Sequence, residues 1–153
     1  MKKQIVKSSA ISLLTLIAIV TAVGFAQGQS LANKIKASVP FDFSVGDQKF
    51  PAGEYWIDRA NENSDDSIVL ISSVDDHHLT FRLTVPIVTQ LAKQKETLIF
   101  HRYGSQYFLA EVWAAGADTG RKFFESNREQ AARAKNLAEK TSMKEETVVS
   151  GPQ

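Results

Sequence analysis

Two acidic residues followed directly by two histidines, Asp75, Asp76, His77 and His78, form the group of side chains in this sequence best suited to chemistry. Carboxylate oxygens and imidazole nitrogens are ligands for Zn²⁺ and similar ions. Adjacent residues of a strand point to opposite faces, so the two histidines can share an ion only if this segment is an irregular loop. The segment therefore predicts either a charged hairpin turn or a metal site, and a third histidine, His101, lies on another predicted strand.

Other catalytic arrangements are missing from the sequence. The chain has no cysteine, no Gly-x-Ser-x-Gly elbow and no phosphate-binding loop, since Gly116–Gly120 lacks the Lys-Ser/Thr ending. Glu54 and Asp58 fall on one face of a predicted strand, where paired carboxylates are more typical of a solvated face than of a glycosidase. We therefore expect a protein without enzymatic activity and without a cofactor.

Large aromatic side chains gather on two predicted strands and beside a predicted hairpin turn. They either fill the core of a small β domain or form a surface that contacts a ligand or partner. These residues are Tyr55, Trp56, Tyr103, Tyr107 and Trp113.

The N-terminus has the pattern of a cleavable signal peptide, residues 1–26. Three lysines precede an apolar run from Ala10 to Val23, and Gly24 and Ala26 place small residues before a cleavage point at Gln27. The run is shorter than the roughly 20 residues that span a bilayer, so an uncleaved anchor is the less favoured alternative. We expect an exported protein of the periplasm or the extracellular space that contacts the membrane only through the signal peptide before cleavage.

Removal of the leader changes the charge of the chain. The full sequence has 18 basic and 17 acidic residues, and the leader carries three lysines and no acid, which leaves a net charge of −2. A slightly acidic domain without a clear basic face is a poor ligand for nucleic acid. No nucleic-acid partner is therefore expected.

The mature chain is expected to begin with a lead-in, residues 27–34, and a β domain, residues 35–124. Apolar residues alternate from Val39 to Val45 and from Leu79 to Val85, and a continuous apolar run at 68–71 suggests a strand buried on both faces. Residues 98–102 and 107–113 are β-prone and flank Gly104 in a hairpin turn. Together these patterns predict an all-β fold, a seven- to eight-stranded antiparallel sandwich or small barrel with a C-terminal helix.

The C-terminal region changes character. Ser126 and Glu129 have the spacing of a capping box and open a predicted helix, residues 125–140. Its thin apolar stripe consists of Ala131, Ala134, Leu137 and Ala138. Residues 141–153 are polar and are predicted to be a disordered tail.

Two segments resemble the opening of a group of small exported bacterial β proteins without an assigned activity, which reads VPFDF-x-VG…PAGEY. The segments are 39–46, VPFDFSVG, and 50–55, FPAGEY. The later residues 110–113, 120–121 and 126–129 are similar to the end of the same group. The resemblance implies an exported β domain and carries over no catalytic residue.

Three functional hypotheses follow. The first is a non-enzymatic envelope protein that binds another macromolecule through a sheet edge, the aromatic residues or the basic helix region. The segment from Arg121 to Lys140, which contains this helix, has six basic and three acidic residues. The second is a carrier of a small apolar ligand in a β-barrel cavity. The third is a metal-dependent enzyme that uses His77, His78 or His101.

Overall fold

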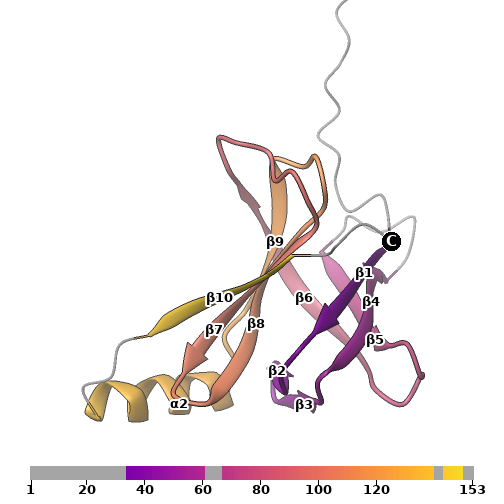
Figure 1. Ribbon diagram of the computed structural model, residues 1–153. Coiled ribbons are helices and arrows are strands. Elements are labelled where there is room, and N and C mark those ends of the chain that lie inside the picture. The colour runs from indigo at the N-terminus through magenta and orange to yellow at the C-terminus, as the bar shows by residue number, and fades with distance from the viewer. Residues whose placement is uncertain (1–33, 61–66, 140–142, 150–153) are drawn as a thin grey trace, which may run out of the picture.

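The computed structural model describes residues 34–60, 67–139 and 143–149 (Figure 1). The predicted signal peptide lies outside these residues, as does the predicted lead-in apart from Lys34. Within the described ranges, no helix has the length and apolar character that a bilayer span requires. The elements are β1 (Ile35–Val39), β2 (Phe43–Val45), β3 (Gln48–Phe50), β4 (Gly53–Arg59), β5 (Ile68–Ser73), β6 (Leu79–Val88), β7 (Thr97–Tyr103), β8 (Gln106–Trp113), β9 (Thr119–Phe123), α2 (Asn127–Ala138) and β10 (Lys144–Val149).

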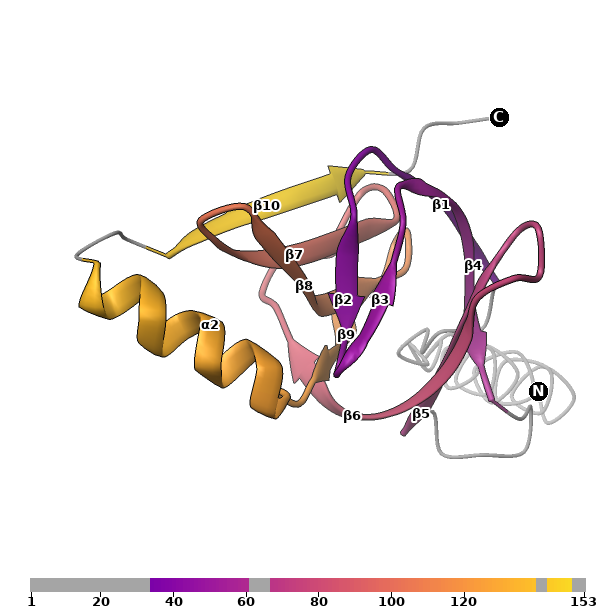
Figure 2. The ribbon, with the colours of Figure 1, turned by 90° about the horizontal axis from the view of Figure 1, so that it is seen from below.

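The strands form one curved, open sheet. Its order is β1-β4-β5-β6-β9-β8-β2-β3, and β7 lies between β8 and β10. All pairs are antiparallel except β2 with β8. The prediction of a mostly β protein is confirmed, but the described part contains ten strands instead of seven or eight, and the sheet does not close. Figure 2 shows β1, β4 and β5 on one side and β7, β8 and β10 on the other.

The curved sheet has two halves, one with β1, β4 and β5 and the other with β7, β8 and β10, and apolar side chains from both halves meet in one core. Along β1, β4 and β5 the buried residues alternate, as expected when one face of a sheet is buried. The buried core residues are Ile35, Ala37, Val39, Phe43, Val45, Phe50, Tyr55, Ile57, Val69, Ile71, Leu98, Phe100, Leu109, Val112, Phe123 and Val148.

The alternating segment from Val39 to Val45 is two strands, not one. β1 ends at Val39 because Pro40 lacks an amide hydrogen for the ladder, and the chain then crosses to the other side of the sheet. All three residues of β2 are buried. Gly46, with φ of 62°, turns the chain into β3.

The hairpin of β7 and β8 agrees with the sequence. Tyr103 pairs with Gln106, so Gly104 and Ser105 form a two-residue turn, and Gly104 has φ of 62°. A turn with positive φ at its first central residue matches the twist of paired strands.

β5 and β6 each bury one face only, so the expectation that residues 68–71 are buried on both faces is wrong. β5 is not buried on both faces, because its residues alternate and Ile68 is exposed. In β6 the apolar residues Leu79, Phe81, Leu83 and Val85 point outward, whereas Thr80 and Thr84 are buried. The alternation predicted for Leu79–Val85 is confirmed, and its apolar residues lie on the exposed side of the sheet.

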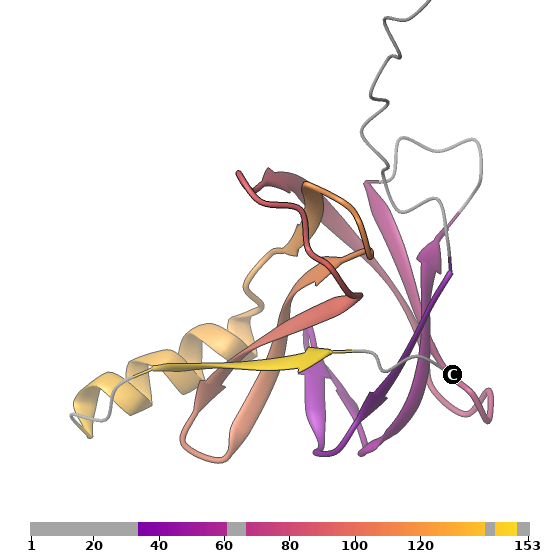
Figure 3. The same cartoon turned by 45° about the horizontal axis from the view of Figure 1, so that its top comes forward.

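The C-terminal region also differs from expectation. Helix α2 begins after the cap residue Ser126, but its buried residues are Glu129, Ala132 and Asn136, and the predicted apolar stripe faces solvent. Residues Lys144–Val149, within the predicted disordered tail, form β10, which pairs antiparallel with β7 and buries Val148. Figure 3 shows β10 crossing beside β7, while α2 runs along the far end of the hairpin.

Candidate functional site

The acidic and histidine residues between β5 and β6 form a turn. The His77 amide donates to the Asp75 carboxylate at 3.3 Å, and the His78 amide donates to the Ser73 hydroxyl at 2.9 Å. Asp76 adopts φ of 58°, as Asp does in tight turns. These contacts are local, and no ligand group of three residues forms here in the described chain, so the structure supports the turn interpretation.

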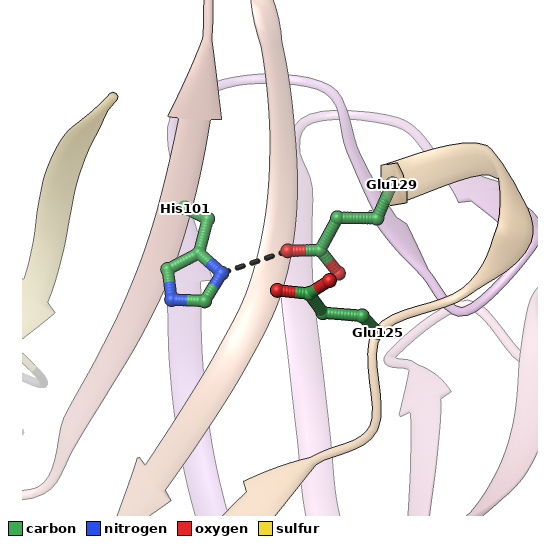
Figure 4. A group of neighbouring side chains, drawn as sticks. All are labelled: His101, Glu125 and Glu129. Atoms are coloured by element: carbon green, nitrogen blue, oxygen red, sulfur yellow. Dashed lines mark hydrogen bonds and ion pairs between the residues drawn. The ribbon is translucent and has the colours of Figure 1, made fainter. Parts of the chain in front are cut away.

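A different histidine has carboxylates gathered around it. His101 on β7 lies 2.7 Å through Nδ1 from Oε1 of Glu129 on α2, and Glu125 points toward both (Figure 4). The ligand atoms of these three residues lie within 4.8 Å of one another. We call them the His101 cluster. Among the described residues, no other group of three histidine and acidic side chains comes this close together.

The His101 cluster is largely enclosed. The side chains of His101 and Glu129 are 15% and 6% exposed, whereas that of Glu125 is 33% exposed. The hydrogen bond to Glu129 raises the pKa of His101 against the opposing effect of burial, and the charges of Glu129, Glu145 and Glu125 add to the increase. The surrounding carboxylates therefore favour the protonated form of the imidazole over the neutral form.

Tyr103 lies next to this cluster on β7. Its ring centre is 6.3 Å from that of His101, and the residue is 3% exposed. Burial, with the charges of Glu129 and Glu125, raises the pKa of Tyr103 to about 12, so the hydroxyl keeps its proton. This hydroxyl has no hydrogen-bond partner among the described residues, which is rare for a buried polar group.

The five aromatic residues predicted as a surface are not brought together. Tyr55, Tyr103 and Trp113 are buried, and Tyr107 packs on the core, where its ring stacks on Phe41 at 4.0 Å. Trp56 is half-buried on β4 beneath the ammonium group of Lys34, 4.7 Å from the ring centre. Most of this set belongs to the packed interior.

An apolar surface exists elsewhere, on the outer side of β5 and β6. Cross-strand pairs place Ile68 opposite Leu83 and Leu70 opposite Phe81. The large exposed fractions, such as 52% for Phe81 and 58% for Leu83, show that the described residues do not cover this surface. The β5–β6 apolar face consists of Ile68, Leu70, Leu79, Phe81, Leu83 and Val85.

A cleft of about 470 Å³ lies between β2, β3 and the β7–β8 turn. Phe43, Phe50 and Tyr107 line it beside the charged residues Lys49 and Arg128. Its volume falls in the range of small-ligand pockets. It sits beside the core cluster, to which Phe43 and Phe50 belong.

Sequence reasoning missed the His101 cluster because Glu125 and Glu129 lie 24 and 28 positions from His101 along the chain. The capping-box spacing of Ser126 and Glu129 was a usable signal, since it predicted where the helix begins. The serine does accept the Glu129 amide, at 3.2 Å, but the glutamate side chain bonds His101 on the hairpin.

Comparisons with known proteins add no assignment. No family model, no curated protein and no solved structure matches the chain.

Proposed function

We propose that this chain is an exported, non-enzymatic binding domain that engages an envelope macromolecule through the β5–β6 apolar face. The observation that carries the proposal is the outward direction of Leu79, Phe81 and Leu83 on a strand whose polar residues are buried. Contiguous exposed apolar surface on a soluble domain marks an interaction site.

The inner side of β6 holds this orientation in place. The Thr84 hydroxyl donates to the carbonyl of Ser67 at 3.0 Å, and the Arg82 guanidinium donates to the carbonyl of Val45 at 3.0 Å. A shift of register by one residue would turn every side chain of β6 to the other face and break both contacts. The apolar face is therefore a fixed feature of the strand.

Charged residues border the face. Asp58 pairs with Leu70 across β4 and β5, and Lys122 pairs with Val85 across β6 and β9. An apolar centre with a charged rim is the usual composition of a protein-binding surface. We therefore favour a protein partner that presents an apolar patch, with no nucleic acid and no bilayer contact in the mature protein.

The architecture fits this role. We class the fold as an open sandwich, supported by core residues contributed from both sides of the sheet. Because the core is filled on the inner side, the outer surfaces are left for binding.

The cleft beside Phe43 and Phe50 supports a second candidate, a small-ligand carrier. Aromatic rings beside Lys49 and Arg128 suit an apolar ligand with an acidic group. Fluorescent fatty-acid probes test this candidate. Lys49→Glu should abolish probe binding if the cleft is used, and the absence of probe binding to the unaltered protein would remove the candidate.

The main proposal is tested with Leu83→Glu on the face and Leu137→Glu as a matched control. Leu137 is an exposed leucine of α2, 69% exposed, and lies outside the face. Immobilised protein is incubated with envelope extract, and the bound proteins are identified by mass spectrometry. We expect the unaltered protein and Leu137→Glu to retain the same specific protein and Leu83→Glu to lose it. Equal retention by all three, or no specific partner, would contradict the proposal.

A further inference from the structure

The His101 cluster joins three parts of the chain that are distant in sequence. His101 comes from the middle of β7, Glu125 from the segment before α2, and Glu129 from the first turn of α2 (Figure 4). Glu145 of β10 lies directly across from His101 in the β7–β10 register. One imidazole thus has carboxylates on the helix side and on the strand side.

The charge around this imidazole is unbalanced. The negative charges of Glu125, Glu129 and Glu145 all interact electrostatically with His101. Among the described residues, the Arg133 guanidinium brings a positive charge to this place, and it forms an ion pair with Glu125 at 3.2 Å. With the imidazole neutral, three carboxylates and one guanidinium leave a local charge of −2. A divalent cation would offset this charge, whereas a proton on His101 offsets only half of it.

The donor set also selects the kind of ion. One imidazole nitrogen with carboxylate oxygens and no thiolate suits Zn²⁺, whereas Ca²⁺ and Mg²⁺ prefer oxygen ligands alone. Zinc–ligand bonds of about 2.0–2.2 Å at tetrahedral angles place two ligand atoms roughly 3.3–3.6 Å apart. The 2.7 Å between His101 Nδ1 and Glu129 Oε1 is a hydrogen-bond distance and has to lengthen when an ion replaces the proton between them. The separations in the cluster are within 4.8 Å, and Glu125, the most exposed member, can close the difference by a small side-chain rotation.

A second observation points to a ligand at this place. The Tyr103 hydroxyl is buried beside the cluster and has no hydrogen-bond partner among the described residues. A zinc site with three protein ligands keeps a water in the fourth position, and neighbouring polar groups can orient it. A zinc-bound water would supply the partner that the hydroxyl lacks.

We propose that His101, Glu125 and Glu129 form a zinc-binding site that fastens α2 to the β7–β10 part of the sheet. Glu145 contributes charge without being a ligand, and the Arg133 guanidinium competes with the ion for Glu125. Zinc binding at this site does not depend on partner binding at the β5–β6 apolar face, so this proposal is independent of the proposed function.

The test is a titration of the chelator-treated, dialysed protein with ZnCl₂, followed by isothermal calorimetry and by the thermal unfolding midpoint. We expect one zinc per chain and a midpoint that rises with zinc concentration, because the folded state alone holds the three ligands together. Glu125→Gln, which alters the most exposed ligand, should weaken zinc binding by about tenfold or more while the circular dichroism spectrum stays unchanged.

Two further variants separate a zinc site from an ion-pair network. Arg133→Gln removes the competing cation and keeps all three ligands, so it should bind zinc at least as tightly as the unaltered protein. If the cluster is only an ion-pair network, Arg133→Gln should lower the stability of the protein, and zinc should not change the unfolding midpoint. His77→Ala and His78→Ala are the matched histidine controls and should leave zinc binding unchanged.

Three results would overturn the proposal. The first is the absence of saturable zinc binding to the unaltered protein. The second is unchanged zinc affinity in both Glu125→Gln and His101→Ala. The third is loss of binding in His77→Ala or His78→Ala, which would place the ion at the β5–β6 turn.

Discussion

The β7–β8 hairpin and the β5–β6 pair are both antiparallel and similar in length, but they differ in what covers them. The hairpin has the core on one side, where Phe100 and Leu109 are buried, and helix α2 on the other, where Tyr103 and Phe108 are buried. The β5–β6 pair has the core on one side only. Its outer apolar residues are therefore left exposed.

This difference shows how the covering element decides the role of an apolar strand. In the hairpin, both faces are covered, so apolar residues on either face are buried and stabilise the fold. In β6, the threonines on the inner face satisfy their polar atoms with backbone groups, as Thr84 does with Ser67. The apolar residues are then free to form a binding surface.

The largest effect is expected from a pair of substitutions on the two sides of β5–β6. Ile71→Ala removes a core side chain that is 1% exposed and should lower the free energy of unfolding by about 2–5 kcal/mol. Leu83→Ala, on the outer face, should change it by no more than about 0.5 kcal/mol. Urea unfolding monitored by circular dichroism measures both. Equal losses would mean that another part of the chain covers the outer face.

A smaller effect is expected where α2 covers the hairpin. Ala132 is buried against Tyr103 and Phe108, so Ala132→Glu would force a carboxylate among apolar side chains and beside Glu129. We expect a loss of about 1–3 kcal/mol and faster amide hydrogen exchange in α2 than in β8.

The matched control for this substitution is the neighbouring residue. Ala131 is exposed on the same helix, and Ala131→Glu should change stability by no more than about 0.5 kcal/mol. If both variants behave alike, α2 does not cover the hairpin in solution, and the contrast between the two regions fails.

The smallest effect concerns the turn between β5 and β6. Hydrogen bonds from Ser73 and from the His77 amide lower the pKa of Asp75 below its ordinary value of about 3.9. Because the folded state lowers this pKa, the stabilisation is present above the unfolded value and is lost as the pH falls through the folded value. A carboxyl-detected NMR titration should show Asp75 titrating below the ordinary range. Asp75→Asn should remove the loss of stability that accompanies protonation of Asp75 at low pH. This loss is slight because the carboxyl group is fully exposed. A titration of Asp75 at its ordinary value would indicate that these local bonds do not hold the turn.

Local patterns predicted several elements well. The hairpin turn follows from Gly104, and the start of α2 follows from Ser126. Each depends on a single residue and its immediate neighbours. The alternation in β6 was equally clear.

Long-range information was needed for the rest. β10 is polar and gave no strand signal, and it forms because β7 offers an unpaired edge to it. The His101 cluster depends on the docking of α2 beside the hairpin, a contact between residues 28 positions apart. Neither feature is encoded in a local pattern.

The sequence by itself determined the periods, the turns and the cap, because backbone sterics and nearest-neighbour hydrogen bonds act within a few residues. Only the tertiary structure decided which face of β6 and of α2 is buried, because that choice depends on which surface meets the core. Leu83 points outward and Glu129 inward for this reason: the Thr84 and Arg82 contacts fix the strand, and His101 receives the glutamate. The apolar face and the carboxylate cluster both result from that choice.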